Sequence, residues 1–223
     1  LVYLDIETTG LSFDDKITTI ACYDGKNVEC FIRGKNLKDF IDYIKNYSTI
    51  VTYNGKSFDV PFIESQFNIK LNHAHLDLRY ILFSLGYKGG LKGCEKQLNI
   101  DRKDLIDIDG YFAVLLWNEY KDNNNNKALE TLLAYNIEDT INLEKLMEIS
   151  FNKKIKKYPF LNLNKTYINE RPYHSFKLDK RLIQKMKKKY SDNYSISFGV
   201  EFEEEYSEEK ETSLIKSFKN WFK

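Results

Sequence analysis

The pattern of apolar and polar positions predicts five short β-strands in the first third of the chain. They are expected over Val2–Thr9, Lys16–Tyr23, Asn27–Ile32, Thr49–Tyr53 and His73–Leu78. The turn-forming stretch Asp24-Gly25-Lys26 indicates that the second and third of these strands form a hairpin. The fourth strand is a short, continuous apolar run, which is typical of a buried parallel strand.

Helical spacing of apolar residues accounts for most of the chain between and after these strands. Helices are expected over Leu37–Tyr47, Phe58–Phe67, Leu78–Leu85, Leu91–Leu98, Tyr111–Tyr120 and Lys127–Ile149. The asparagine run Asn123–Asn126 predicts a loop between the last two helices. Strands that alternate with helices after an initial hairpin favour an α/β fold, in which the hairpin lies beside a parallel core.

The last third of the chain has a different pattern. A basic amphipathic helix is expected, with an apolar stripe formed by Leu178, Leu182, Ile183, Met186 and Tyr190. It is either a surface helix packed on the preceding domain or a basic wall that guides a nucleic-acid backbone. A strand is expected over Tyr194–Phe202 and a closing helix over Glu208–Phe222. We therefore expect one domain over residues 1–150 and a basic α+β extension over residues 151–223, packed on or beside it.

The composition indicates a folded globular protein, since 42% of the 223 residues are apolar and 15% are aromatic. A run of eighteen apolar residues does not occur, so no membrane span is expected.

Cys22, Cys30 and Cys94 are odd in number and lack C-x-x-C spacing. This favours reduced, structural cysteines in a cytoplasmic protein over a disulfide framework or a zinc site. The sequence starts at Leu1, inside the first expected strand, so a few residues are expected to precede it.

The formal net charge of +1 conceals an uneven distribution. Residues 1–150 carry 17 Lys and Arg against 23 Asp and Glu, and residues 151–190 carry 13 against 2. Residues 191–223 are acidic again, with 4 against 8. An acidic body followed by a basic segment suits a metal-dependent enzyme with a polyanionic substrate. Within the acidic body, Lys92 and Lys96 are one helical turn apart and either contact phosphate or are exposed to solvent.

Two carboxylates stand one residue apart on the first strand, at Asp5 and Glu7. They leave the same face of the strand, and paired acids among apolar residues are unfavourable without a neutralising cation. Asp59 starts the helix after the fourth strand, where the helix dipole favours negative charge. Tyr135 and Asp139 are four residues apart and share one face of the last long helix. We expect these groups to meet outside the carboxyl ends of the strands, as a divalent-metal site.

Two further groups of residues have both a chemical and a structural interpretation. His73, His75 and Asp77 alternate on one strand face, and either ligate a transition metal or pack and form hydrogen bonds. The stretch Asp107-Ile108-Asp109-Gly110 is either a fragment of a calcium loop or the loop that starts a helix.

The candidate acids lie in three motifs whose order is informative. The motifs are DIETTGL at residues 5–11, TYNGKSFD at 52–59 and YNIED at 135–139. Either D-x-E or Y-x3-D alone is expected by chance, but the ordered set is not. As a set they resemble the exonuclease motifs of the DnaQ-like superfamily of 3′–5′ exonucleases. Tyr135 places the resemblance in the tyrosine (DEDDy) branch, because Ala134 stands where the other branch has histidine.

Three intervening stretches also resemble the YprB-like ribonuclease H-like group of this superfamily. They are HLDLRY, LKGCEKQLNIDR and DIDGYFAVLLWNEY. The resemblance covers about residues 1–150. It implies a ribonuclease H-like fold, in which a mixed five-stranded sheet has helices on its flanks.

The resemblance implies phosphodiester hydrolysis by a two-metal mechanism. Asp5 would bridge both ions. Glu7 and Asp139 would complete the first site, and Asp59 would hold the second. All-oxygen ligands suit Mg²⁺ or Mn²⁺ rather than zinc, and four carboxylates in one cleft would repel one another without such ions. Tyr135 would orient the attacking water, because its ordinary pKa of about 10 is too high for a full base at neutral pH.

The resemblance also implies four substrate contacts. Thr8 and Leu11 would meet the terminal sugar and base. Asn54 and Phe58 would flank the strand end, where the phenyl ring offers a stacking surface. Leu11 and Phe58 have an alternative interpretation as core residues, and Asn54 has one as a turn former.

The sequence therefore predicts a metal-dependent 3′–5′ exonuclease that acts on single-stranded nucleic-acid 3′ ends, with DNA favoured. An RNA-trimming exoribonuclease is the nearest alternative. A nucleic-acid-binding module without catalysis and a structural domain that interacts through its last helix are alternatives from other classes.

Overall fold

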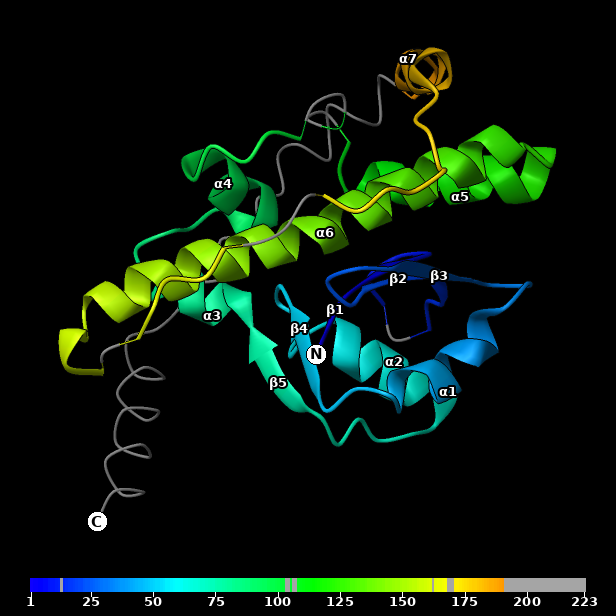
Figure 1. The fold of residues 1–223 in the computed structure, drawn as a ribbon. Helices are drawn as coiled ribbons and strands as arrows, with labels where there is room; N and C mark the ends of the chain where they lie inside the picture. The colour runs from blue at the N-terminus through cyan, green and yellow to red at the C-terminus, as the bar shows by residue number, and fades with distance from the viewer. Residues whose placement is uncertain (13, 103–104, 106–107, 162, 168–170, 191–223) are drawn as a thin grey trace. The chain divides into compact units, whose positions relative to one another are not determined.

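The computed structural model describes residues 1–12, 14–102, 105, 108–161, 163–167 and 171–190 (Figure 1). The chain divides into two compact units, Leu1–Ile183 and Gln184–Lys223. The division predicted at residue 150 remains a prediction, but that position falls inside a long helix. The strand predicted over Tyr194–Phe202 and the helix predicted over Glu208–Phe222 lie outside the described residues.

A mixed five-stranded sheet forms the centre of the first unit, as the sequence predicted (Figure 1). Its strands are β1 (Val2–Thr8), β2 (Ile17–Tyr23), β3 (Val28–Ile32), β4 (Thr49–Thr52) and β5 (Ala74–Asp77), in the spatial order β3-β2-β1-β4-β5. Strand β1 pairs antiparallel with β2 and parallel with β4, and β4 pairs parallel with β5. The hairpin and the parallel core therefore meet at β1, which carries the candidate acids.

The structure also describes several helices. They are η1 (Leu37–Asp39), α1 (Phe40–Ile44), α2 (Asp59–Phe67), α3 (Leu78–Phe83), α4 (Gly90–Gln97), α5 (Gly110–Asn123), α6 (Asn126–Lys156), η3 (Pro159–Leu161) and α7 (Lys180–Lys189). Helix α6 crosses one face of the sheet, and α1 and α2 cover the other (Figure 1).

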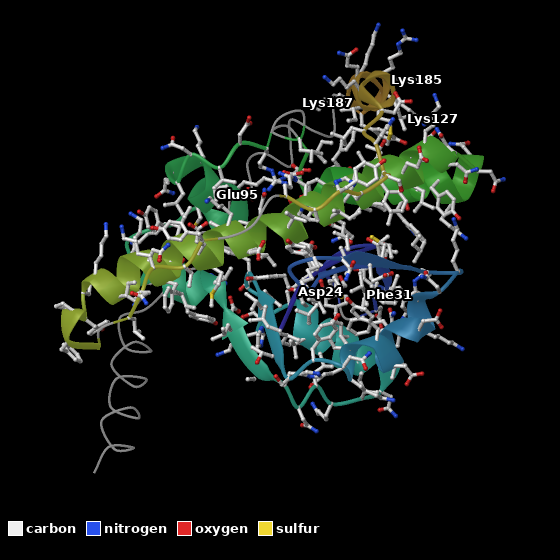
Figure 2. The ribbon with its side chains drawn as sticks, in the orientation of Figure 1. Asp24, Phe31, Glu95, Lys127, Lys185 and Lys187 are labelled. Carbon is white, nitrogen blue, oxygen red and sulfur yellow. The ribbon has the colours of Figure 1, made fainter. Side chains whose placement is uncertain are left out.

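Successive side chains of β1 point to opposite faces of the sheet, and this alternation explains why helices pack on both faces. Val2, Leu4 and Ile6 belong to a buried cluster with residues of α1 and α2, which also includes Phe31 (Figure 2). Tyr3, from the opposite face of β1, packs in a second cluster that contains Ile137 of α6. Because side chains two positions apart share a face, Asp5 and Glu7 leave β1 on the side of α6.

Several predicted helix boundaries differ from the structure. The helix predicted over Leu37–Tyr47 is divided into η1 and α1 and ends at Ile44, where the Asn46 side chain donates to the carbonyl oxygen of Tyr43 at 3.0 Å. Helix α6 continues beyond the predicted end to Lys156, and lysines in its last turn complement the helix dipole. The loop before α6 contains only Asn124 and Asn125, because Asn124 ends α5 with a left-handed backbone at φ 51°.

Asn152 and Phe176 make further contacts within the first unit. The side chain of Asn152 exchanges two hydrogen bonds with the backbone of Thr166, at 2.8 and 2.9 Å. Phe176 packs against the cluster on the α6 face of the sheet. Within the described ranges, no helix has the length and hydropathy needed to cross a bilayer. Cys22, Cys30 and Cys94 are all free.

Candidate active site

Three carboxylates converge where β1 passes beneath α6. Asp5 and Glu7 come from β1 and Asp139 from α6, and one oxygen of each lies within 4.8 Å of the others. Glu7 and Asp139 are buried, whereas Asp5 is partly exposed. The sequence predicted that these three acids meet. Among the residues that the structure describes, no other group of three or more His, Cys, Asp or Glu side chains meets this spacing.

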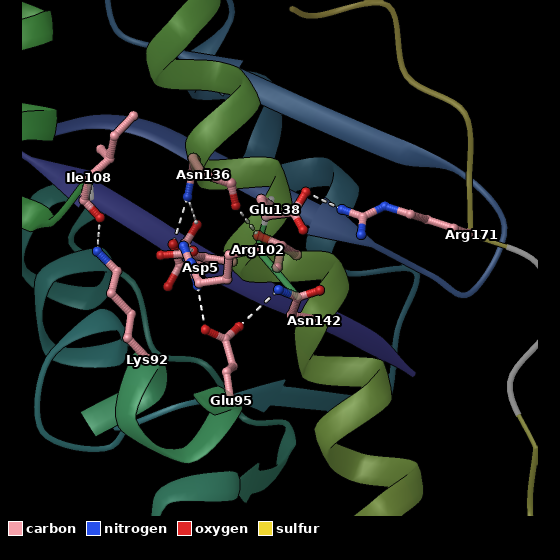
Figure 3. A network of polar contacts seen from close by, with 11 residues as sticks. Asp5, Lys92, Glu95, Arg102, Ile108, Asn136, Glu138, Asn142 and Arg171 are labelled. Carbon is pink, nitrogen blue, oxygen red and sulfur yellow. Dashed lines mark hydrogen bonds and ion pairs between the residues drawn. The ribbon is translucent and has the colours of Figure 1, made fainter. Parts of the chain in front are cut away.

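Asn136 fixes the orientation of Asp5 (Figure 3). Its amide nitrogen donates to the Asp5 carboxylate at 2.7 Å, and its amide oxygen accepts from the Thr19 hydroxyl at 3.0 Å. Asn136 follows Tyr135 directly, but nothing in the sequence pattern indicated a role for it. Its contacts join residues more than a hundred positions apart, so local spacing could not show them.

Asp59 lies beside this cluster but outside the set of three. Its carboxylate accepts the backbone N–H of Ile6 at 3.2 Å, so the first turn of α2 is tied to β1. Burial raises the pKa of Asp59 to about 7, and the nearby Asp77 contributes to the rise. Asp59, the fourth predicted acid, is therefore held next to the other three by its hydrogen bond to the backbone of β1.

The electrostatics of the cluster favour a bound cation. Burial raises the pKa of Asp5 well above its usual range, and repulsion from Asp59, Asp139 and Glu7 adds to the effect. Burial and Asp139 likewise raise the pKa of Glu7. A divalent cation would relieve both the repulsion and the lost hydration. The donors are carboxylate oxygens, so the residues fit Mg²⁺ or Mn²⁺.

Lys92 of α4 faces the acids, while Lys96 is exposed. The ammonium of Lys92 donates to the carbonyl oxygen of Ile108 (Figure 3) and lies 5.0 Å from the ring centre of Tyr135. Burial lowers the pKa of Lys92, and Asp139 opposes that change. The solvated interpretation is therefore correct for Lys96 and wrong for Lys92, because folding turns only Lys92 towards the acids.

Arg102 supplies a second, buried cation that the sequence analysis did not identify. One of its terminal nitrogens lies 2.5 Å from a Glu95 oxygen, and the other pairs with Asp139 (Figure 3). The second Glu95 oxygen accepts from the Asn142 amide at 2.9 Å. Burial alone would lower the pKa of Arg102, but Asp139 and Glu95 raise it overall. Arg102 thus anchors Asp139 to α4 and neutralises part of the acidic cluster.

Tyr135 is almost fully buried beside these groups, with 3% of its surface exposed. Burial raises its pKa well above the usual value, and the charges of Asp139 and Glu7 raise it further. The hydroxyl therefore keeps its proton at neutral pH. It can donate or accept a hydrogen bond, but it is not an ionised base.

A cavity of about 380 Å³ opens beside the acids. Its lining includes Asp5, Glu7, Asp59 and all four predicted substrate contacts, Thr8, Leu11, Asn54 and Phe58. Tyr53, Gly110, Tyr111 and Val114 also line it. The volume is near the lower end of small-molecule sites. The acids thus lie along a wall that a substrate-sized group could contact.

The four contact residues differ in their local environments. Leu11 is 69% exposed, so it is not a core residue, whereas Phe58 is half-buried and packs against Phe62 at a ring-centre distance of 4.7 Å. Asn54 has a left-handed backbone at φ 63°, as a turn former does, and its side chain also accepts from Arg79 at 2.5 Å. The Thr8 hydroxyl donates to the carbonyl oxygen of Gly10 at 2.6 Å, which fixes the turn after β1.

His73, just before β5, and His75, within β5, form hydrogen bonds instead of a metal site. His73 contacts the carbonyl oxygen of Ile44 at 3.1 Å, and His75 contacts the hydroxyl of Thr52 at 2.9 Å. These contacts agree with the structural interpretation of the pair.

Asp77, at the end of β5, organises the loop before α2. Its carboxylate accepts the backbone N–H groups of Asn54, Lys56 and Arg79, at 2.8, 3.0 and 3.0 Å. It therefore caps α3 and shapes the loop that carries Asn54 and leads to Asp59. Asp109 starts α5 by accepting from the Phe112 N–H at 2.8 Å, as a helix-start loop predicts, while Asp107 lies outside the described residues.

Known proteins resemble this chain in sequence or in fold. The family model of the RNase H superfamily matches residues 2–150. A family B DNA polymerase from the hyperthermophilic archaeon Pyrobaculum calidifontis is similar in structure, with a TM-score of 0.53 and 18% identity over 72% of this chain and 24% of that chain. The zinc-bound complex of E. coli ExoI with ssDNA has a TM-score of 0.35 and 17% identity, over 54% of this chain and 40% of that chain. No curated protein matches the chain.

This chain thus spans about a quarter of the polymerase chain and two fifths of the ExoI chain. At 18% identity, the likeness to the polymerase supports the fold alone.

Proposed function

Because this chain belongs to the RNase H superfamily, we propose that it is a metal-dependent 3′–5′ exonuclease of the DnaQ-like, DEDDy type, within the YprB-like group. The substrate is a single-stranded nucleic-acid 3′ end, with DNA favoured. One observation carries the proposal: the carboxylates of Asp5, Glu7 and Asp139 lie within 4.8 Å of one another, beside a cavity that Asp59 also lines.

The acids would hold two divalent ions, Mg²⁺ or Mn²⁺. Asp5 would contribute to both, Glu7 and Asp139 to the first, and Asp59 to the second. When bound, such ions stabilise the charge on the attacking and leaving oxygens of a phosphodiester. The raised pKa values of Asp5 and Glu7 support this assignment, because crowded acids gain most from a cation.

Three other side chains would position the reaction. The protonated hydroxyl of Tyr135 orients the attacking water. Lys92 adds positive charge near the Tyr135 ring, where it attracts the phosphate. Arg102 is engaged by Glu95 and Asp139, so it holds Asp139 in place and does not contact substrate.

The cavity would receive the terminal nucleotide. Leu11 is exposed at its wall and offers an apolar contact for a base, and Phe58 offers a ring for stacking. Thr8 and Asn54 supply polar groups at the same wall. Hydrolysis here releases one nucleotide at a time from the end of a strand.

The test is incubation of the purified protein with 5′-labelled single- and double-stranded DNA and RNA, in Mg²⁺, Mn²⁺ or EDTA. We expect single-stranded DNA to shorten by single nucleotides in either metal and to remain intact in EDTA. Comparison of the DNA and RNA arms distinguishes the favoured substrate from the exoribonuclease alternative.

Two variants and one control make this test specific. Asp5→Ala and Asp139→Asn should abolish nucleotide release while the circular dichroism spectrum stays that of the folded protein. Asp42→Asn is the matched control, because Asp42 is an exposed acid in a surface ion pair with Lys45. Release that persists in both site variants, or in EDTA, would overturn the proposal.

A further inference from the structure

A second, larger hollow adjoins the candidate active site. It has a volume of about 1100 Å³ and shares Leu11 and Phe58 with the acidic cavity. Its other walls come from the turn after β1, the segment from Arg33 to Asp39 and helix α2. We call it the basic hollow. Leu11 and Phe58 therefore stand between the two cavities.

The charges around the basic hollow suit a polyanion. Four cations line it, Lys16, Arg33, Lys35 and Lys38, against the two acids Asp15 and Asp39. The Asp15 carboxylate is already used within the turn, where it accepts from the Thr9 hydroxyl at 2.7 Å and from the Ser12 N–H at 2.8 Å. Positive charge therefore exceeds the negative charge that remains open to a ligand.

One of these cations is held by hydrogen bonds and the other three are exposed. Arg33 donates to the carbonyl oxygen of Ile17 at 2.6 Å and to the side chain of Gln66 at 2.5 Å. Lys16, Lys35 and Lys38 are exposed. A fixed guanidinium with exposed lysines around it suits a backbone whose phosphates vary in position.

Aromatic rings form part of the wall of the basic hollow. Phe58 and Phe62 pack at a ring-centre distance of 4.7 Å, and Phe67 lies further along α2. All three are only partly buried, so each keeps some ring surface accessible. Cations that follow a backbone together with aromatic rings that stack bases are typical of sites for single-stranded nucleic acid.

We propose that the basic hollow binds the nucleotides immediately 5′ of the terminal one. Their phosphates lie near Lys16, Lys35 and Lys38, and their bases against Phe58 and Phe62. The inference rests on the proposed function for its substrate. The inference adds a path for the nucleic-acid strand through the basic hollow. Such a path is needed because the acidic cavity has a volume of only about 380 Å³, so the rest of the strand must lie elsewhere.

Affinity for fluorescent oligodeoxythymidylates of increasing length, measured by anisotropy in EDTA, tests the path without requiring hydrolysis. The double variant Lys35→Gln/Lys38→Gln should bind long strands about 5- to 20-fold more weakly than wild type. Its log Kd should depend less steeply on log salt, by about 1.4, since each phosphate contact on a single strand contributes about 0.7.

Two further double variants act as comparisons. Lys45→Gln/Lys70→Gln removes two exposed lysines that pair with Asp42 and Glu64 and do not line the basic hollow, and it should bind like wild type. Lys185→Gln/Lys187→Gln in the basic helix α7 (Figure 2) tests the rival path. A loss of affinity in the α7 variant with none in Lys35→Gln/Lys38→Gln would overturn the proposal.

A crosslink gives a second readout that does not depend on the lysines. Ser65 is exposed and lines the basic hollow, so p-benzoylphenylalanine at this position should crosslink to nucleotides near the 3′ end. The same group at Ser48, which is exposed but does not line the basic hollow, should not. Equal crosslinking at both positions would overturn the proposal.

Different experimental results would contradict the proposed function and the proposed path of the strand. If the protein releases no nucleotides in Mg²⁺ but binding in EDTA is lost in Lys35→Gln/Lys38→Gln, the path holds and the nuclease assignment fails. If release is robust but the affinity of this variant equals that of wild type, the path fails alone.

Discussion

Arg102 forms a buried ion pair with Asp139, one of the clustered acids, and about 5% of the surface of either residue is exposed. Asp139 is therefore both a candidate metal ligand and the partner of a buried guanidinium, which Glu95 holds from the other side. This arrangement reduces the cost of burying several acids together. It also fixes Asp139 against α4, so the geometry of the site depends on residues that line no part of the cavity.

Removing Arg102 should destabilise the protein strongly. Arg102→Met leaves Glu95 and Asp139 buried without their ion-pair partner, and the expected loss is about 3–5 kcal/mol of unfolding free energy. Urea denaturation measures this loss. Adding Glu95→Leu to Arg102→Met should recover part of it, because one of the two uncompensated acids is then absent.

The exposed pair of Lys45 and Asp42 provides the control for Arg102, since Lys45→Met should change stability little. A result in which Arg102→Met and Lys45→Met destabilise the protein equally would contradict a structural role for the buried pair.

Stability should depend on both pH and metal. The raised pKa values of Asp5, Glu7 and Asp59 mean that the metal-free folded protein retains protons which the unfolded chain has released. This contribution is present at acid pH and is lost as the pH rises towards and through about 7, the pKa of Asp59. For Asp59 it amounts to at most about 4 kcal/mol.

Thermal unfolding in EDTA should therefore give a Tm that falls between about pH 5 and 8. Mg²⁺ or Mn²⁺ should raise the Tm, and by more at the higher pH. Asp59→Asn should flatten the fall in EDTA, whereas Asp42→Asn should not. An identical pH dependence in wild type and Asp59→Asn would argue against the raised pKa.

Replacing the hydroxyl of Tyr135 should separate catalysis from metal binding. Tyr135→Phe keeps the buried ring but removes the group proposed to orient water, so kcat should fall about 10²-fold or more. The Tm increase on adding Mg²⁺ should stay close to that of wild type, because the carboxylates are intact. Unchanged kcat would remove Tyr135 from the mechanism.

The loop before α2 should tolerate no side chain at Gly55. A Cβ there would lie 2.2 Å from the Thr52 hydroxyl oxygen, which also contacts His75. Gly55→Ala should cost about 1–3 kcal/mol and shift the loop that carries Asn54. Gly110→Ala is the matched control, because a Cβ at Gly110 would meet nothing within 4 Å. Equal unfolding midpoints in urea for the two variants would refute this packing argument.

The sequence by itself determined the strands and which of the candidate groups share a face of one element. Strand β1 alternates with period two, so Asp5 and Glu7 had to leave one face, and Tyr135 and Asp139 shared a face because they are one helical turn apart. The parallel pairing of β1 and β4 then placed Asp59 near them. The shared faces depend on local periodicity, which can be recognised in a single sequence, whereas the pairing of β1 with β4 is a feature of the folded sheet.

Only the tertiary structure decided which other groups meet the acids. Lys92 and Lys96 lie one helical turn apart on α4, so the local sequence does not distinguish them. In the structure only Lys92 points inwards, and Lys96 is exposed. Arg102 is 37 positions from Asp139, and Asn136 is 131 positions from Asp5. Periodicity identifies a buried face but not its partner, because the pairing of distant polar groups depends on how α4, α6 and β1 pack together.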